Sequence, residues 1–228
     1  MSSSSFLVAM SGGSGSGKST LADALIRTLG PEKAVIFHED GYYWPMRHYG
    51  PCDTPEQRAA IIEQANYDDP ASKDTRHLVN DIRALKSGQA IEQPVYDFDR
   101  HDRDPDRTWR IEPAPVIILE GIHALSIPEL QPLIDLSIYV DTPDDLRLAR
   151  RLRRDVVERG RTVPNVLEHY LKTVRAAHYR FTFPAKFEAD LVIADEGLPA
   201  YGKVYADEDA IDRMLAPVRS RLQIMGVL

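Results

Sequence analysis

Residues 12–19, Gly-Gly-Ser-Gly-Ser-Gly-Lys-Ser, constrain the fold more than any other stretch because they match the pattern G-x-x-x-x-G-K-[ST]. An apolar run at residues 6–10 precedes the motif, and a helical pattern over residues 18–29 follows it. Glycines permit a tight turn whose backbone N–H groups converge, and the following helix adds positive charge at its first turn. This order of strand, turn and helix predicts a polyphosphate site. A flexible Gly/Ser turn is the alternative, but it does not account for the flanking strand and helix.

Two side chains of this phosphate loop predict its chemistry. Lys18 can reach the β- and γ-phosphates as a point charge, and the Ser19 hydroxyl is placed to ligate Mg²⁺. The expected nucleotide-binding residues are Gly12, Gly13, Ser14, Gly15, Ser16, Gly17, Lys18, Ser19 and Thr20.

Composition narrows the class of protein. With 228 residues, 43% hydrophobic and 28% charged, we expect a single α/β domain over residues 1–228, without disorder or a membrane span. A net charge of −7 argues against a general nucleic-acid binder and favours a small-molecule partner. Cys52 is the only cysteine, which excludes an intramolecular disulfide and a multi-cysteine metal site. No basic segment precedes the first apolar run, so we expect a cytoplasmic protein.

Five apolar segments alternate with helical patterns, which predicts a doubly wound parallel sheet of about five strands with flanking helices. These segments are residues 6–10, 34–37, 116–119, 136–140 and 191–194. Open sheets of this kind keep their ligands at the carboxyl edge. Asp40 and Glu120 follow two of the segments and would lie there. Asp40 is a candidate base and metal ligand, or else a turn or capping residue, and spacing alone does not favour either interpretation. Glu120 is a candidate metal ligand, or else a helix cap.

The acceptor side is expected to come from the middle of the chain. Residues 44–52 predict a loop, Thr54 to Gln64 a helix capped by Thr54, and residues 73–86 a further helix. Asp68, in the turn between them, has two acceptor oxygens for vicinal hydroxyls, although a solvated turn is the alternative. Alternation over residues 94–112 predicts a β-hairpin arm. Its Tyr96, Phe98 and His101 would face a flat base, or else pack within the arm.

Arginines crowd one side of a predicted helix at residues 143–159, opposite its apolar residues. We interpret residues 150–164 as a lid that closes on the phosphates and stabilises the transferring charge. The alternative is a solvated face paired with neighbouring acids, which explains part of the cluster. Further helices are expected at residues 165–180 and 208–225.

Taken together, these motifs resemble the uridine kinase (uridine–cytidine kinase) family within the phosphoribulokinase/uridine kinase group of P-loop kinases. The resemblance extends from about residue 6 to residue 193 and rests mainly on the hairpin and arginine motifs. The matching motifs are the phosphate loop, D-x-Y-Y at Asp40, N-Y-D-x-P at Asn66, P-x-Y-D-F-x-x-H-x-R at Pro94, E-G-I at Glu120, R-R-x-x-R-D-x-x-E-R-G-R at Arg150 and A-D-L-V-I at Ala189.

The resemblance implies a P-loop NTPase-like fold and transfer of the γ-phosphate of ATP or GTP, with Mg²⁺, to the 5′-hydroxyl of uridine or cytidine. It also implies a tetramer. By position it implies Asp40 as base, with Lys18, Arg151, Arg154, Arg159 and Arg161 completing the catalytic set, and Ser19, Asp40 and Glu120 around the metal. The implied acceptor-binding residues are Asp40, Tyr43, Tyr67, Asp68, Tyr96, Phe98, His101, Arg151, Arg161 and His169.

Several positions depart from the family pattern and leave the acceptor open. Gly41 stands where serine is usual, His169 where a glutamine contacts the nucleoside, and Ala176 where proline is common. The turn reads Asp-Asp-Pro-Ala-Ser at residues 68–72, and the segment after Ile193 also differs. The alternatives are therefore a kinase of the same group for another alcohol (a sugar phosphate, pantothenate or nicotinamide riboside) or a nucleotide-binding regulatory module.

Overall fold

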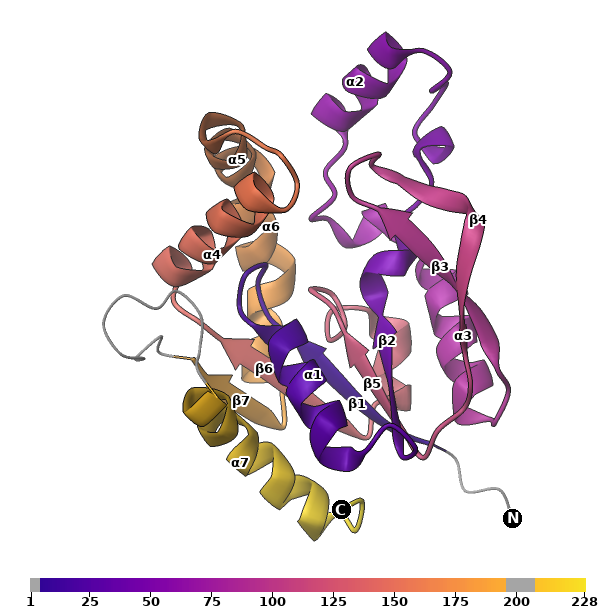
Figure 1. Cartoon of the computed structure of the whole chain (residues 1–228), viewed down its shortest axis with the longest axis vertical. Helices are drawn as coiled ribbons and strands as arrows, with labels where there is room; N and C mark the ends of the chain where they lie inside the picture. Colours follow the sequence, from indigo (N-terminus) through magenta and orange to yellow (C-terminus); the bar gives the residue numbers. More distant parts are fainter. Residues whose placement is uncertain (1–4, 196–207) are drawn as a thin grey trace.

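The five predicted strands form one parallel sheet in the computed structural model, which describes residues 5–195 and 208–228 (Figure 1). They are β1 (Phe6–Ser11), β2 (Ala34–His38), β5 (Val116–Glu120), β6 (Leu136–Asp141) and β7 (Leu191–Ala194). Their order in the sheet is β2-β5-β1-β6-β7, and every neighbouring pair is parallel. Each strand begins where the sequence predicts and ends at most one residue later, so the predicted doubly wound α/β architecture is confirmed.

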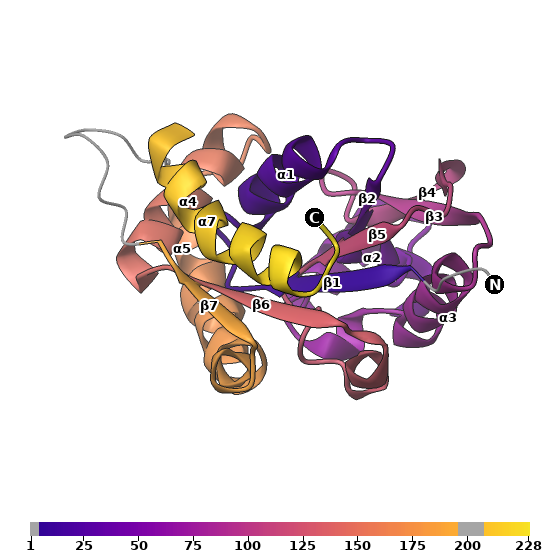
Figure 2. The same cartoon turned by 90° about the horizontal axis from the view of Figure 1, so that it is seen from below.

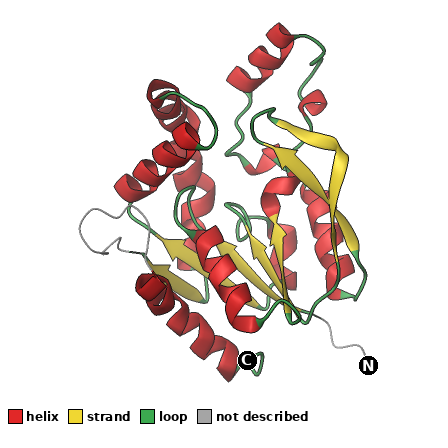
Figure 3. Cartoon of the chain, in the orientation of Figure 1, coloured by secondary structure: helices red, strands yellow, loops and turns green. Residues whose placement is uncertain are grey.

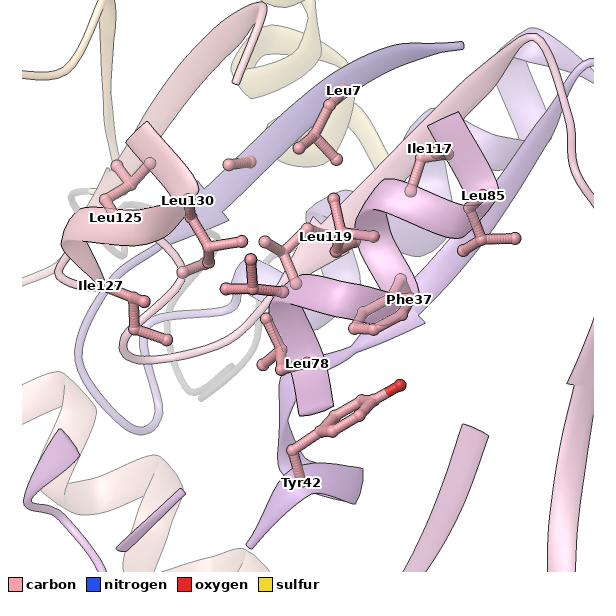
Figure 4. Packing of buried hydrophobic residues seen from close by; sticks show 14 of the residues in the cluster. Leu7, Phe37, Tyr42, Leu78, Leu85, Ile117, Leu119, Leu125, Ile127 and Leu130 are labelled. Atoms are coloured by element: carbon pink, nitrogen blue, oxygen red, sulfur yellow. The ribbon is translucent and has the colours of Figure 1, made fainter. Parts of the chain in front are cut away.

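Helices cover both faces of the sheet because successive strand residues point to opposite sides. In β1, Val8 and Met10 pack with α1 (Lys18–Leu29) and α7 (Glu208–Ile224), which lie side by side in Figure 2. Leu7 and Ala9 face the other way, toward α3 (Thr75–Lys86) and the 3₁₀ turn Pro128–Leu133. Figure 4 shows this second layer of the core around Leu78, Leu119 and Leu130. The two layers fix the carboxyl edge of the sheet, on which the site is built.

Two projections stand above that edge. One is the hairpin arm of β3 (Ile91–Asp97) and β4 (Asp102–Ile111), which begins three residues earlier than predicted, together with α2 (Pro55–Gln64). Thr54 caps α2, since its side chain accepts a hydrogen bond from the Gln57 backbone N–H. The other projection contains α4 (Asp144–Val157) and α5 (Val163–His169), which face the arm in Figures 1 and 3.

The helix predicted at residues 165–180 is less regular than expected. It begins as α5 at Val163, widens into π-helical turns at Tyr170–Val174 and His178–Thr182 around the short α6 (Arg175–Ala177), and ends in the 3₁₀ turn Phe183–Phe187. Such widened turns are frequent near functional sites. Within the described residues, no helix is both long and apolar enough to cross a bilayer. Residues 196–201, part of the divergent segment noted in the sequence, lie outside the described residues.

In α4, charged side chains are buried and an apolar one is exposed, which is the reverse of the usual pattern. Arg147, Arg150, Arg151 and Asp155 are its buried residues, whereas Ala149 on the apolar side is exposed. A solvated arginine face, the alternative considered from sequence, is therefore wrong for these side chains. They are buried because they pack against the phosphate loop and against one another.

Candidate active site

The phosphate loop is shaped by glycine conformations and by a close approach of α4. Gly15 and Gly17 have φ of +82° and +86°, in the left-handed region that favours glycine. A Cβ atom on Gly15 would collide with the Arg147 carbonyl oxygen, and one on Gly13 with the Arg147 guanidinium. Arg147 itself is buried, and its Nε donates to the Thr142 carbonyl oxygen at 3.2 Å. The motif predicted the loop, but not that Arg147 supports it from behind.

Three predicted metal ligands line one cavity of about 250 Å³ at the sheet edge: Ser19, Asp40 and Glu120. The Ser19 hydroxyl donates to Glu120 Oε2 at 3.0 Å, and Lys18 Nζ lies 3.8 Å from the same oxygen. His38, which no sequence motif indicated, pairs with Glu120 Oε1 through Nδ1 at 2.9 Å. Burial would raise the pKa of Glu120, but the charge of Lys18 and the hydrogen bond with His38 outweigh burial and lower it.

The donor atoms at this edge suit a hard cation. Among residues 5–195 and 208–228, no group of three or more His, Cys, Asp or Glu side chains could hold a metal by itself. A hydroxyl and two carboxylates, completed by phosphate oxygens and water, are the ligands that Mg²⁺ takes at phosphate sites. The residues present therefore fit a Mg²⁺ bound together with a nucleotide.

Asp40 lies on the 3₁₀ helix Glu39–Tyr42 that follows β2. Its side chain is 39% exposed and borders both the metal-side cavity and a second cavity described below. Lys73 Nζ donates to its Oδ1 at 2.9 Å. Partial loss of solvent opposes ionisation of Asp40, but Lys73, Lys18 and Arg159 together lower its pKa far below the usual range. Asp40 is therefore an anion at neutral pH. The residue that precedes this 3₁₀ helix is His38, so Asp40 is not its cap.

The second cavity, of about 80 Å³, brings together all ten residues selected for the acceptor. Its aromatic wall contains Tyr43 and Tyr96, with ring centroids 4.9 Å apart, and Phe98, 5.3 Å from Tyr96. Asp68 lines the same cavity from the turn before α3; it is 8% exposed, and its Oδ2 accepts from the Thr173 hydroxyl at 3.4 Å. The complete set is Asp40, Tyr43, Tyr67, Asp68, Tyr96, Phe98, His101, Arg151, Arg161 and His169.

Two histidines that line this cavity accept hydrogen bonds from arginines, so both imidazoles are uncharged. Arg161 Nη2 donates to His101 Nε2 at 3.2 Å, and Arg151 Nη2 donates to His169 Nδ1 at 3.2 Å. Burial, followed by the charge of Arg161, lowers the pKa of His101 to about 4. Burial also lowers the pKa of His169. With Nε2 accepting from Arg161, the proton of neutral His101 is on Nδ1.

Four arginines of the segment interpreted as a lid pair with one carboxylate. Asp155 is 0% exposed, and its oxygens lie 2.9 Å from Arg154, 3.4 Å from Arg159, 3.5 Å from Arg151 and 3.7 Å from Arg161. Arg151 also donates from Nη1 to the Ser14 hydroxyl at 3.0 Å, which joins the lid to the phosphate loop. Four cations around one buried anion leave a net positive charge, and Arg151 brings part of it into contact with the loop.

A third cavity, of about 260 Å³, extends from the phosphate loop toward α7. It includes Thr20, Arg150 and Arg154, and α7 contributes the apolar Ile211 and Met214. Arg150 Nη1 is paired with Asp195 Oδ2 at 2.6 Å at its border. The position and mixed lining suit the part of a nucleotide beyond its phosphates, a role for α7 that no sequence motif indicated.

Comparison with known proteins agrees with this geometry. Residues 7–198 match the Phosphoribulokinase / Uridine kinase family. The chain belongs to this family. Among curated family relatives, the uridine kinase of Alkaliphilus metalliredigens is 38% identical over 216 residues, 95% of this chain and 96% of that protein. The uridine kinase of Lactiplantibacillus plantarum is 38% identical over 95% of both chains.

Two solved kinase structures share the fold. Phosphoribulokinase from Rhodobacter spheroides superimposes with a TM-score of 0.60 at 17% identity, covering 89% of this chain and 75% of that one. D-glycerate 3-kinase from Cryptococcus neoformans gives a TM-score of 0.57 at 13% identity, covering 80% of each chain. At these identities the similarity shows the common architecture alone.

Proposed function

We propose that the protein is a uridine/cytidine kinase, which transfers the γ-phosphate of ATP or GTP to the 5′-hydroxyl of a pyrimidine nucleoside in salvage. The observation that carries the proposal is the acceptor cavity, which borders the phosphate loop at Ser14 and Lys18 and is lined by aromatic, acidic and arginine side chains. A nucleotide-binding regulatory module would not need such a second, separate pocket. The curated relatives named uridine kinase support the choice of acceptor.

In this proposal the two substrates meet between Lys18 and Asp40. The phosphate loop and Lys18 hold the donor phosphates. Asp40 accepts the proton of the acceptor's 5′-hydroxyl while the oxygen of that hydroxyl bonds to the γ-phosphorus. The bond from that phosphorus to the bridging oxygen breaks, and the nucleoside diphosphate leaves. Arg151, Arg154 and Arg159 stabilise charge on the transferring group. Ser19, Asp40 and Glu120 would hold Mg²⁺, which neutralises phosphate charge when bound.

The acceptor is recognised by complementary side chains. Asp68 accepts hydrogen bonds from the ribose hydroxyls, and Tyr96 and Phe98 contact the faces of the base. His101 presents its Nδ1–H to a carbonyl or ring acceptor on the base edge. Tyr43 and Tyr67 close the wall, while Arg161 and His169 hold the arrangement from the lid side.

The test is Mg²⁺-dependent ATP consumption with uridine, cytidine, adenosine, nicotinamide riboside, ribulose 5-phosphate and pantothenate, each product being identified by its mass. We expect stimulation by uridine or cytidine and formation of the 5′-monophosphate. Turnover with another alcohol alone would overturn the pyrimidine acceptor and point to Gly41 and His169 as marks of a different substrate. Nucleotide hydrolysis that no alcohol stimulates would favour the regulatory module.

The remaining properties of the proposed enzyme rest on two sources: the length, composition and N-terminal sequence for the domain and the location, and the family resemblance for the oligomer. We infer one kinase domain over residues 1–228, a homotetramer and a cytoplasmic location, where nucleotide and nucleoside are both available. Light scattering coupled to gel filtration tests the tetramer, since a monomeric or dimeric mass would contradict it.

A further inference from the structure

Lys73, to which no sequence motif assigns a role, lies next to Asp40, the proposed catalytic carboxylate. The Lys73 side chain is 0% exposed, and its Nζ lies 2.9 Å from Asp40 Oδ1 and 3.5 Å from Glu39 Oε1. Nζ also lies 3.5 Å from the Glu39 carbonyl oxygen and 3.3 Å from the centroid of the Tyr43 ring. One buried ammonium thus contacts two neighbouring carboxylates and one wall of the acceptor cavity.

Backbone pairing fixes where this ammonium lies. Lys73 and Tyr43 form an antiparallel bridge. On either side of it, the Trp44 N–H donates to the Ser72 carbonyl at 3.0 Å and the Asp74 N–H donates to the Tyr42 carbonyl at 2.8 Å. The segment before α3 is therefore tied to the segment that carries Asp40, so the side chain of Lys73 has little freedom to leave.

Stability alone does not account for this arrangement. Glu39 is 0% exposed, and its Oε2 already accepts from the His123 backbone N–H at 2.8 Å. Burying ions costs desolvation energy that their attraction does not reliably return, and neutral side chains of similar volume are often as stable. The Lys73 ammonium is in addition closer to Asp40, which faces substrate, than to the enclosed Glu39 carboxylate.

We propose that Lys73 is a positioning residue that holds Oδ1 of Asp40, so that the other oxygen, Oδ2, is directed to the acceptor hydroxyl. The inference rests on the proposed kinase function and adds to it a residue that does not itself touch substrate. A carboxylate held at one oxygen rotates less freely about its terminal bond. The reacting oxygen is then aligned before the acceptor binds, which is the condition under which orientation lowers the barrier.

The experiment compares Lys73→Met with the double variant Glu39→Gln/Lys73→Met, which leaves no unpaired charge at Glu39. We expect kcat to fall by ~10- to 100-fold in both, since small losses of alignment have effects of this order. The KM for nucleotide and for acceptor should change by less than ~3-fold. The melting temperature should fall in the single variant and recover in the double. Recovery of kcat with stability would overturn the proposal, because Lys73 would then serve only to neutralise Glu39.

Two further comparisons make the result specific. In an Asp40→Asn background, Lys73→Met should lower kcat by no more than ~2-fold, whereas an undiminished further loss would show that Lys73 does not act through Asp40. The exposed Lys33→Met is the matched control and should behave as wild type. All variants are assayed with the alcohol that wild type phosphorylates best. An acceptor other than uridine or cytidine would overturn the proposed function and leave the Lys73 test intact, and wild type inactive with every alcohol would overturn both.

Discussion

The donor and acceptor sides of the site are built in different ways. The donor side is largely one continuous loop at residues 12–19, whose backbone conformation depends on glycines. The acceptor side is built from side chains of several separate segments between Asp40 and His169. These segments are far apart in the sequence and belong to different strands, helices and turns. A backbone site tolerates side-chain changes but not a new Cβ atom, whereas a side-chain site responds to each functional group. Substitutions on the two sides should therefore affect different substrates.

The two sides meet at few residues. Among the residues assigned catalytic roles, Lys18 and Arg154 border both the acceptor cavity and the third cavity, which extends from the phosphate loop on the donor side. Asp40 borders the acceptor cavity and the metal-side cavity. Changes at these shared residues should affect turnover, while changes at residues of one side should affect binding of one substrate. The comparison can be tested by measuring nucleotide and acceptor binding separately from kcat.

The largest effect is expected at Asp40. Asp40→Asn removes the proton acceptor but keeps the shape, so kcat should fall by ~10²- to 10⁴-fold, the range typical of general acid–base groups. Nucleotide affinity, measured by calorimetry, should stay within ~3-fold of wild type. The exposed Asp99→Asn in the hairpin turn is the control. Turnover that survives Asp40→Asn would exclude Asp40 as the base.

A single Cβ atom in the loop should have the next largest effect. In Gly15→Ala the methyl group meets the Arg147 backbone at a residue whose φ is +82°. We expect nucleotide affinity to fall by ~100-fold, because the loop must distort by amounts that misalign its N–H groups. Acceptor affinity should change little.

Gly226→Ala is a matched control for this substitution. Gly226 also has a positive φ, +71°, but no atom lies within 4 Å of the added Cβ. It therefore carries the same backbone strain without the collision. Equal losses of nucleotide binding in the two variants would contradict the role assigned to the contact with Arg147.

The same difference explains how much the sequence could predict. The strands and the phosphate loop are encoded locally, in apolar runs and in eight consecutive residues, and they appear at the predicted positions. Local pattern made Asp68, Tyr96, Phe98 and His101 acceptor candidates but left structural alternatives open, and it left Asp40 even between base and turn residue. The family resemblance then favoured the acceptor roles and added the other residues. Their meeting in one cavity depends on how the arm and lid projections are placed by the sheet, which no local pattern records.

What the sequence did not predict are contacts between distant residues. His38 and Glu120 lie on neighbouring strands in matched register, and Lys73 reaches Asp40 through an isolated bridge. Arg147 was visible only as one of many arginines, and its burial under the loop follows from the packing of α4. In each of these contacts the two residues are far apart in the sequence, so the spacing of residues within a motif gives no indication of the contact.

A moderate effect on both substrates is expected from Asp155. Asp155→Asn keeps the volume but removes the charge that gathers four lid arginines, which should then repel one another. We expect kcat to fall by ~10-fold and KM to rise by a few-fold for both nucleotide and acceptor, because Arg154 borders both cavities. Asp212→Asn, which breaks an exposed pair with Arg219, is the control and should have no effect. A loss confined to one substrate would show that the lid serves one side only.

The smallest effect is a pH dependence of stability from His178, behind the donor loop. Burial, then the charge of Arg147, lowers its pKa to about 4, although Asp144 and Asp141 oppose this. Between the unfolded pKa of about 6.5 and the folded pKa, the unfolded chain binds a proton that the folded chain does not. This contribution to stability is therefore complete above pH 6.5 and is lost as the pH falls toward 4, by ~2 kcal/mol at pH 5.

His178→Leu should reduce by that amount the difference in unfolding free energy between pH 7 and pH 5, measured by urea denaturation. His101→Leu on the acceptor side should give a similar change, because the pKa of His101 is also lowered to about 4. The two variants should differ in function, since only His101→Leu should raise the acceptor KM. If His178→Leu also raised the acceptor KM, the packing of His178 behind the phosphate loop would influence the acceptor cavity. The donor and acceptor sides would then not be independent.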